Sequence, residues 1–377
     1  MSKKKILFTT YDLRIGGVEK VLVNLLNNLD YNKYEVTLYL QFREGEFLNQ
    51  LNSNIIVKDY NLVKSKNVIY RKIINGIKFI SILLKNYHKF DFSCCFGSGY
   101  IPSAKLALKA SKNNAAWLHT NIINFMKSND YLQQLYKNDK TLEDKCKHFI
   151  NSYYFREFQN QIFVSNDAQK AYLTLYPEDE HKIKVIRNLI DSAFVMKNLD
   201  EKIDIKKDKN EVIFLTVGRH TEYDKRLTRL IGACKKLKDN YKFKVIMVGS
   251  GDQTEYYKKM VKKYKLDNYF DFVGFKSNPF PYYKNADAMI LCSQFEGFPT
   301  TFIEAMIMNV PIITTNVSDA MDIIDNKYGI VVENNDNAIY DGMKKFLDEG
   351  FKIKKRFDFK KYNEESLKQL ESMFDEK

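Results

Sequence analysis

Two carboxylates eight residues apart form the strongest candidate site in the sequence. Glu296 follows an apolar run and Glu304 comes eight positions later, in Phe295-Glu296-Gly297-Phe298-Pro299-Thr300-Thr301-Phe302-Ile303-Glu304. Pro299 suits the first turn of a helix, and a helix over all eight residues would hold the carboxylates roughly 12 Å apart. That is too far for a pair sharing one bond, but it fits two contacts to a long ligand whose anionic part faces the helix N-terminus.

Two cations follow the first strand-like run in the second half of the chain. Gly218 and Arg219 come directly after the run 212–217, and Lys225 lies six positions after Arg219. A guanidinium and an ammonium in one loop or first helical turn can converge on a diphosphate. Gly16 and Gly17 open a helical run after the first strand, where bare N–H groups and the helix dipole also favour phosphate. Taken alone, the two cations are better explained as solvated surface charges, and the two glycines fit a simple turn equally well.

Strand-like and helix-like segments alternate to position these residues. The runs that predict strands include 5–10, 34–40, 54–58, 212–217, 243–248, 269–273, 287–292, 311–315 and 329–332. Alternating β and α units predict parallel sheets covered by helices on both faces. The polar stretch 196–210 is the best linker candidate. A length of 377 residues also suits two domains. We therefore expect an α/β protein with two doubly wound domains, residues 1–190 and 191–359, followed by a last amphipathic helix.

The net charge of +13 is concentrated in the first half of the chain. Residues 1–190 hold 28 basic and 17 acidic residues, a net of +11, whereas residues 191–377 hold 32 and 30, a net of +2. Residues 64–89 hold seven basic residues, no acidic one, and an apolar series at helical spacing: Ile69, Ile73, Ile77, Ile80 and Leu84. One interpretation is an amphipathic helix with a solvated basic face. The other is a helix that docks on an anionic membrane surface.

Composition and the opening residues narrow the class of protein. An apolar fraction of 45% predicts a folded chain, and no uncharged apolar run approaches the roughly 18 residues of a membrane-spanning helix. The start, residues 1–8, is basic and then briefly β-like, with no cleavage site of a signal peptide. Five scattered cysteines form no metal-binding spacing and indicate reduced thiols. These features predict a cytoplasmic protein.

Taken together, the motifs resemble one enzyme family. They occur in order as Gly-Gly-x-Glu (Gly16, Gly17, Glu19), Asn188-x-x-Asp191, Gly-Arg-x5-Lys (Gly218, Arg219, Lys225) and Glu-x7-Glu (Glu296, Glu304). In this combination the sequence resembles the retaining glycosyltransferases of family 4, of the type that builds bacterial surface glycans. The resemblance spans nearly the whole chain and is strongest over 211–332. It implies the GT-B fold, in which two Rossmann-like domains flank an interdomain cleft and a terminal helix, here 360–377, completes the first domain.

The resemblance also implies a nucleotide-sugar donor, with UDP as the expected nucleotide. The diphosphate would be held by Gly16, Gly17, Arg219 and Lys225, the ribose by Glu304, and the base by Phe275 and Lys276. The donor sugar would contact Glu296 and the segment Gly297, Phe298, Pro299 and Thr300. His119, in Trp117-Leu118-His119-Thr120, matches a position near the reacting carbon. His119 and Glu296 are therefore the expected catalytic residues.

The chemistry expected of such a site needs no metal or other cofactor. Its main task is to stabilise the charge of the leaving diphosphate, which Arg219, Lys225 and the helix at 299–308 can do. No Asp-x-Asp occurs in the sequence, so the common metal–diphosphate motif is missing. Two departures from the family pattern stand out. Residues 318–322 replace a frequent Gly-Gly-x-x-Glu, and Pro299 replaces a frequent glycine, which removes one N–H donor.

Three functions compete at this point. The leading one is transfer of a hexose or N-acetylhexosamine to a lipid-linked glycan or protein acceptor, by an enzyme held on the inner face of the cell membrane through residues 64–89. A nucleotide-sugar epimerase would use the same fold, although the paired motifs argue against it. A basic nucleic-acid-binding protein is supported only by the net charge, because no recognised motif is present; we expect no nucleic-acid partner.

Overall fold

The computed structural model describes residues 2–375 except 98, 200, 202, 204 and 206. The chain forms two compact units, Met1–Asp191 with Lys360–Lys377 and Ser192–Phe359. These limits lie within one residue of the domain boundaries expected from the sequence. Of the expected linker 196–210, the first residues belong to helix α8 (Ser192–Asn198), whereas positions 200, 202, 204 and 206 lie outside the described residues.

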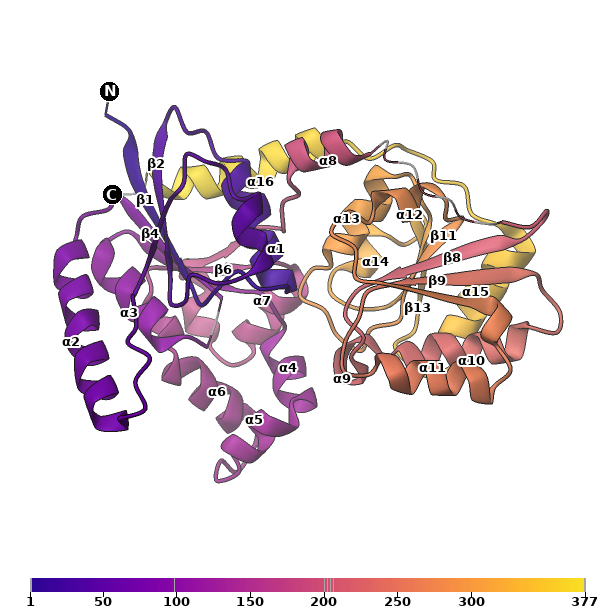
Figure 1. Cartoon of the computed structure of the whole chain (residues 1–377), viewed down its shortest axis with the longest axis horizontal. Coiled ribbons are helices and arrows are strands. Elements are labelled where there is room, and N and C mark those ends of the chain that lie inside the picture. Colours follow the sequence, from indigo (N-terminus) through magenta and orange to yellow (C-terminus); the bar gives the residue numbers. More distant parts are fainter. Residues whose placement is uncertain are drawn as a thin grey trace. The chain divides into compact units, whose positions relative to one another are not determined.

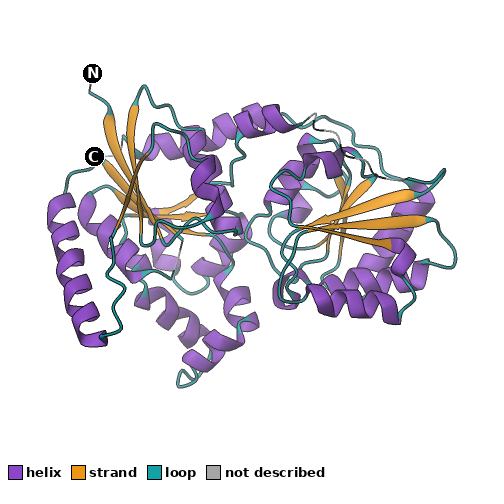
Figure 2. Cartoon of the chain, in the orientation of Figure 1, coloured by secondary structure: helices purple, strands orange, loops and turns teal. Residues whose placement is uncertain are grey.

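The first unit is built on a seven-stranded parallel sheet with helices on both faces (Figures 1 and 2). Its strand order is β3-β2-β1-β4-β5-β6-β7. The strands are β1 (Lys4–Thr10), β2 (Tyr34–Leu40), β3 (Ile56–Asp59), β4 (Phe92–Phe96), β5 (Asn114–Leu118), β6 (Asn160–Phe163) and β7 (Ile183–Val185). The helices are α1 (Gly17–Asn27), α2 (Val68–Asn86), α3 (Ile101–Ala110), α4 (Ile122–Ser128), α5 (Asp130–Leu135), α6 (Leu142–Ser152) and α7 (Asn166–Leu173). Central strands such as β4 and β5 are buried along their whole length, which explains why most of their residues are apolar.

Helix α16 (Phe359–Met373) belongs to the first unit although it ends the chain. The Tyr362 hydroxyl donates to the carbonyl of Asn188 at 2.8 Å, and the Asn363 amide donates to the carbonyl of Ile190 at 2.7 Å. Beyond the helix, the Phe374 ring lies 4.9 Å from that of Phe92. These contacts explain why an amphipathic helix with no following strand is stable: its apolar face completes the first core.

The second unit contains a six-stranded parallel sheet in the order β10-β9-β8-β11-β12-β13. The strands are β8 (Val212–Val217), β9 (Phe243–Val248), β10 (Phe270–Gly274), β11 (Ala288–Leu291), β12 (Ile312–Thr315) and β13 (Gly329–Val332). Its further helices are α9 (Glu222–Lys225), α10 (Leu227–Leu237), α11 (Thr254–Lys263), α12 (Phe280–Lys284), α13 (Thr300–Ile307), α14 (Ala320–Ile323) and α15 (Ala338–Glu349). Two parallel sheets covered by helices confirm the prediction of two doubly wound α/β domains (Figure 2).

Helix α2 exposes the apolar series found in the sequence. An ordinary amphipathic helix would bury that series, but Ile69, Ile73, Ile77, Ile80 and Leu84 are between 56% and 73% exposed. The contact with the first unit is made instead by another side of the helix, through Phe79, Ile82 and Leu83. Figure 1 shows α2 on the outside of this unit. We call the five exposed residues the α2 stripe.

Candidate functional site

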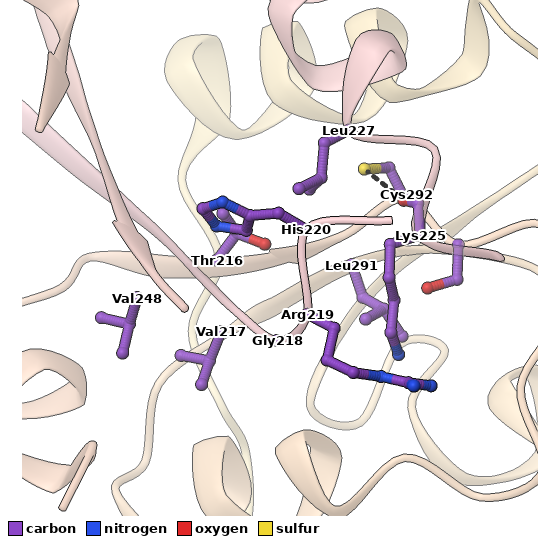
Figure 3. Close-up of a pocket in the computed structure, with 11 residues that line it drawn as sticks. Thr216, Val217, Gly218, Arg219, His220, Lys225, Leu227, Val248, Leu291 and Cys292 are labelled. Atoms are coloured by element: carbon purple, nitrogen blue, oxygen red, sulfur yellow. Dashed lines mark hydrogen bonds between the residues drawn. The ribbon is translucent and has the colours of Figure 1, made fainter. Parts of the chain in front are cut away.

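The strand order of the second unit marks where a ligand is expected. β8 lies between β9 and β11, so the connections leaving β8 and β11 run to opposite sides. In open parallel sheets, ligands bind outside the carboxyl ends of the strands at such a switch point. A pocket of about 260 Å³, including its part open to solvent, lies at this position. It is lined by Thr216, Val217, Gly218, Arg219, His220, Lys225, Leu227, Val248, Leu291, Cys292 and Ser293 (Figure 3).

Lys225 and Glu296 form a mostly buried ion pair beside this pocket. The Lys225 ammonium lies 2.5 Å from Glu296 Oε1, and the two side chains are only 19% and 13% exposed. The Ser293 hydroxyl donates to the same carboxylate oxygen at 2.6 Å. Burial acts to lower the pKa of Lys225, but the carboxylates of Glu296 and Asp224 outweigh it and raise that pKa above its ordinary value. Lys225 is therefore a fixed positive charge at neutral pH.

Arg219 provides the second cation and is more exposed. Its guanidinium lies 3.6 Å from the Asp224 carboxylate, and its side chain is 55% exposed. In Figure 3 the side chains of Arg219 and Lys225 extend toward the same side of the loop after β8. The structure thus brings together the two cations that the sequence predicts for a diphosphate, each already facing a carboxylate.

A buried arginine that the sequence analysis did not single out fixes the loop after β11. Arg229 is 4% exposed, and its guanidinium donates to the carbonyl of Cys292 at 3.2 Å and to the Gln294 side chain at 2.6 Å. It also donates to Asn334 at 2.8 Å and Asp336 at 3.0 Å, after β13. These bonds tie two loops together and set the position of the segment that carries Glu296.

Helix α13 begins later than the sequence predicts. Pro299 is its N-cap and Thr300 its first residue, so Glu296 precedes the helix. The separation of roughly 12 Å between Glu296 and Glu304 was expected only for a helix over all eight residues, so it does not apply to this segment. No side chain caps the N-terminus of α13. In the segment between, Phe298 is buried and the carbonyl of Gly297 accepts a hydrogen bond from Ser318, which stands in the segment that departs from the family pattern.

Glu304 is held by a tyrosine. The Tyr283 hydroxyl donates to Glu304 Oε2 at 2.9 Å. Phe275 and Lys276, expected to hold a base, follow β10, which is two strands away from β8, and they are not among the residues that line the pocket. Phe275 is 44% exposed, so its ring has a free face.

The predicted residues of the first unit lie at the carboxyl edge of its own sheet. Gly16 is the N-cap of α1 and Gly17 its first residue. A Cβ on Gly16 would stand 2.0 Å from Glu19 Oε2, so the Glu19 carboxylate folds back over this turn. An acidic side chain therefore lies against the turn whose amide groups are expected to face phosphate.

His119 directly follows β5 and has an unusual environment. Its ring centroid lies 4.5 Å from that of Phe96 and stacks on Trp117 at 5.9 Å. Both ring nitrogens are buried, and no described residue forms a hydrogen bond with either. Burial lowers the pKa of His119 to about 3, so the ring is neutral at physiological pH. Unsatisfied buried polar atoms are costly, which makes His119 a candidate for a polar contact with a ligand.

Three residues of this site were missed by reasoning on the sequence. Arg229 lies among apolar helix positions, and Tyr283 stands in the run Pro279–Lys284, which carries no recognisable motif. Ser293 gave a weak signal only, as a hydroxyl three residues before Glu296.

Comparisons with known proteins agree with this geometry. The family described as "Glycosyltransferase Family 4" matches residues 15–194, and "Glycosyl transferases group 1" matches residues 197–366. The two matches meet close to the boundary between the compact units.

Individual relatives and solved structures have low sequence identity to this chain, and those described here agree with the two family matches. An uncharacterised glycosyltransferase of Methanocaldococcus jannaschii is 30% identical over 51% of this chain, which spans only about half (52%) of that relative's length. The Campylobacter jejuni GalNAc-alpha-(1->4)-GalNAc-alpha-(1->3)-diNAcBac-PP-undecaprenol alpha-1,4-N-acetyl-D-galactosaminyltransferase is 27% identical over 87% of this chain and 84% of its own. The structure of Anabaena HepE with UDP and glucose superposes with a TM-score of 0.73, at 16% identity, covering 98% of this chain and 100% of HepE.

Proposed function

The chain belongs to glycosyltransferase family 4 and has the GT-B fold, and on this premise we propose that it transfers a sugar from a UDP-sugar to a glycan acceptor with retention of configuration. The observation that carries the proposal is the convergence of Arg219, Lys225 and Glu296 at the switch point, next to the uncapped N-terminus of α13. One bacterial relative is named as an N-acetyl-D-galactosaminyltransferase that acts on an undecaprenol-linked glycan, and another as a capsular polysaccharide biosynthesis glycosyltransferase. The HepE structure contains UDP.

The proposed chemistry relies on stabilising the leaving diphosphate. Negative charge grows on the phosphate oxygen that was bonded to the sugar as this bond breaks. Preorganised cations lower the barrier by stabilising that charge. Lys225 is held rigid by burial, whereas the exposed Arg219 side chain is able to follow the ligand. Together with the N–H groups of α13, these two cations supply positive charge for the diphosphate, so we propose that transfer requires no metal.

His119 would act as a neutral hydrogen-bonding group. With a pKa of about 3 it carries no proton to donate as an acid at neutral pH. Its buried nitrogens are instead suited to one donor and one acceptor bond with sugar hydroxyls. Glu296 would contact the donor sugar and Glu304 the ribose.

We further propose a lipid-linked glycan or a protein as the acceptor and attachment to the cytoplasmic face of the membrane through α2. The C. jejuni relative is named for an undecaprenol-linked acceptor. None of the helices in the described part of the chain is long and apolar enough to cross a bilayer. The α2 stripe, however, offers apolar side chains flanked by Arg71, Lys72, Lys78 and Lys85, and these are the two ingredients of interfacial binding.

Calorimetry with a panel of nucleoside diphosphates tests the donor site. We expect UDP to bind, and Lys225→Ala to weaken it by about 1.5–3 kcal/mol, the scale of a charge-assisted hydrogen bond. Lys262→Ala, an exposed lysine on α11, serves as the control. If Lys225→Ala binds UDP as tightly as Lys262→Ala does, Lys225 does not bind the diphosphate.

Donor cleavage measured with and without acceptor separates the transferase from the epimerase, because an epimerase needs no acceptor.

A further inference from the structure

Tyr283 is a buried functional group that the proposed reaction does not use directly. It lies in α12, its side chain is fully buried, and its ring packs 6.5 Å from that of Phe280. Its hydroxyl bonds to the carboxylate of Glu304, on α13. The residue therefore connects a helix of the core to the position expected to hold the ribose.

The direction of this hydrogen bond is set by its surroundings. Burial, together with the nearby Glu304 carboxylate, raises the pKa of the Tyr283 hydroxyl well above its ordinary value, so the group keeps its proton and donates. The Tyr283 ring is fixed by its burial and packing, whereas the Glu304 side chain is partly exposed and has more rotatable bonds. A rigid donor at 2.9 Å selects one orientation of that carboxylate.

We propose that Tyr283 is a positioning residue for nucleotide recognition: its hydroxyl holds the Glu304 carboxylate in the orientation that accepts the ribose hydroxyls. The inference rests on the proposed function, because it needs a nucleotide at this site. The recognised chemistry is a vicinal diol, so Tyr283 contributes to selection of ribose over deoxyribose without touching either.

The test compares UDP with 2′,3′-dideoxy-UDP by calorimetry on the full chain. For the unmodified protein we expect UDP to bind more tightly. Tyr283→Phe keeps the ring and removes only the hydroxyl, so it should weaken UDP roughly 10-fold, the effect of about one hydrogen bond, and leave dideoxy-UDP unchanged. The matched control is Tyr282→Phe, the same change on the neighbouring residue of α12, which should alter neither constant.

Each result is decisive. If Tyr283→Phe weakens both nucleotides equally or neither, Tyr283 has a structural role only and the inference fails while the donor site stands. If the unmodified protein binds no nucleoside diphosphate, both the proposed function and this inference are wrong. The Glu304→Gln background is a second test, because Tyr283 should act only through Glu304: there, adding Tyr283→Phe should change the ratio of the two constants no further, and a further change would contradict the inference. If Tyr283→Phe does not fold, Glu304→Gln alone must still weaken UDP and leave dideoxy-UDP unchanged, and an equal loss for both nucleotides would overturn the inference.

Discussion

Replacing Glu296 by Gln should make UDP bind more tightly, although Glu296 lies in the proposed site. In the free protein Glu296 neutralises Lys225 across 2.5 Å. A diphosphate that approaches Lys225 must compete with this carboxylate and is repelled by it. Glutamine keeps the size of the side chain and its bond from Ser293, but it removes the negative charge.

The magnitude follows from a thermodynamic cycle. At an effective dielectric constant of about 20, unit charges 2.5 Å apart attract by roughly 7 kcal/mol, most of which offsets their desolvation. Removing one partner of a fully buried pair costs about 3–5 kcal/mol. Because these side chains are 19% and 13% exposed, we expect about 1–3 kcal/mol. That loss falls on the free protein and is recovered when a diphosphate replaces the missing anion, which corresponds to about 5- to 150-fold tighter UDP binding.

Calorimetric titration of UDP, with thermal melting of the free and bound protein, measures both sides of the cycle. Glu296→Gln should melt at a lower temperature without UDP and recover with it. Glu255→Gln is a matched control, since Glu255 pairs with Lys258 at 2.8 Å but is 74% exposed. Unchanged or weaker UDP binding in Glu296→Gln would refute the competition between carboxylate and diphosphate. The same variant should transfer sugar more slowly, because its contact with the donor sugar is altered.

Three further predictions concern the reaction, His119 and α2. Transfer should survive EDTA, because fixed cations already counter the leaving group; loss of activity restored by Mn²⁺ would contradict this. Since the pKa of His119 is lowered from 6.5 to about 3, the unfolded chain takes up a proton first, and the free energy of unfolding should fall as the pH drops from about 6.5 toward 3. His119→Phe should flatten that dependence in melting curves, and an identical profile would mean that His119 titrates normally. The protein should sediment with anionic liposomes at low salt and be released at high salt. Ile73→Ser with Ile77→Ser should abolish sedimentation, whereas Leu135→Ser, an exposed leucine on α5, should not.

Many of the strands were predictable because burial leaves a strong local pattern. The structure places β2, β8, β9 and β13 at the predicted residues and shifts β10, β11 and β12 by a single residue at one or both ends. A parallel strand covered on both faces is mostly apolar, so a run of consecutive apolar residues marks where it begins and ends. The first residue of α13 was harder to predict, because proline is accepted both at the N-cap and in the first turn of a helix.

The contacts of the site were not predictable, because they join residues far apart in the chain. Lys225 and Glu296 are 71 positions apart, and Tyr283 and Glu304 are 21 apart. The spacing of motifs identified the charged residues but not their partners. For α2, the sequence correctly predicted a helix but not which of its sides faces solvent. Phe79, Ile82 and Leu83 form a second apolar side, and this is the side that packs against the core.

In the free protein, each group proposed to bind the diphosphate already lies beside a carboxylate. Lys225 faces Glu296, Arg219 faces Asp224, and the Glu19 carboxylate covers the turn at Gly16. Unopposed cations would bind the product diphosphate as well as the donor, and uniform binding of this kind does not accelerate turnover. Internal carboxylates lower the affinity for both ligands and favour release of the product. Glu296 would recover the difference for the donor alone, because only the donor carries the sugar that Glu296 is proposed to contact. Selectivity for donor over product would then arise from the same ion pair that weakens diphosphate binding.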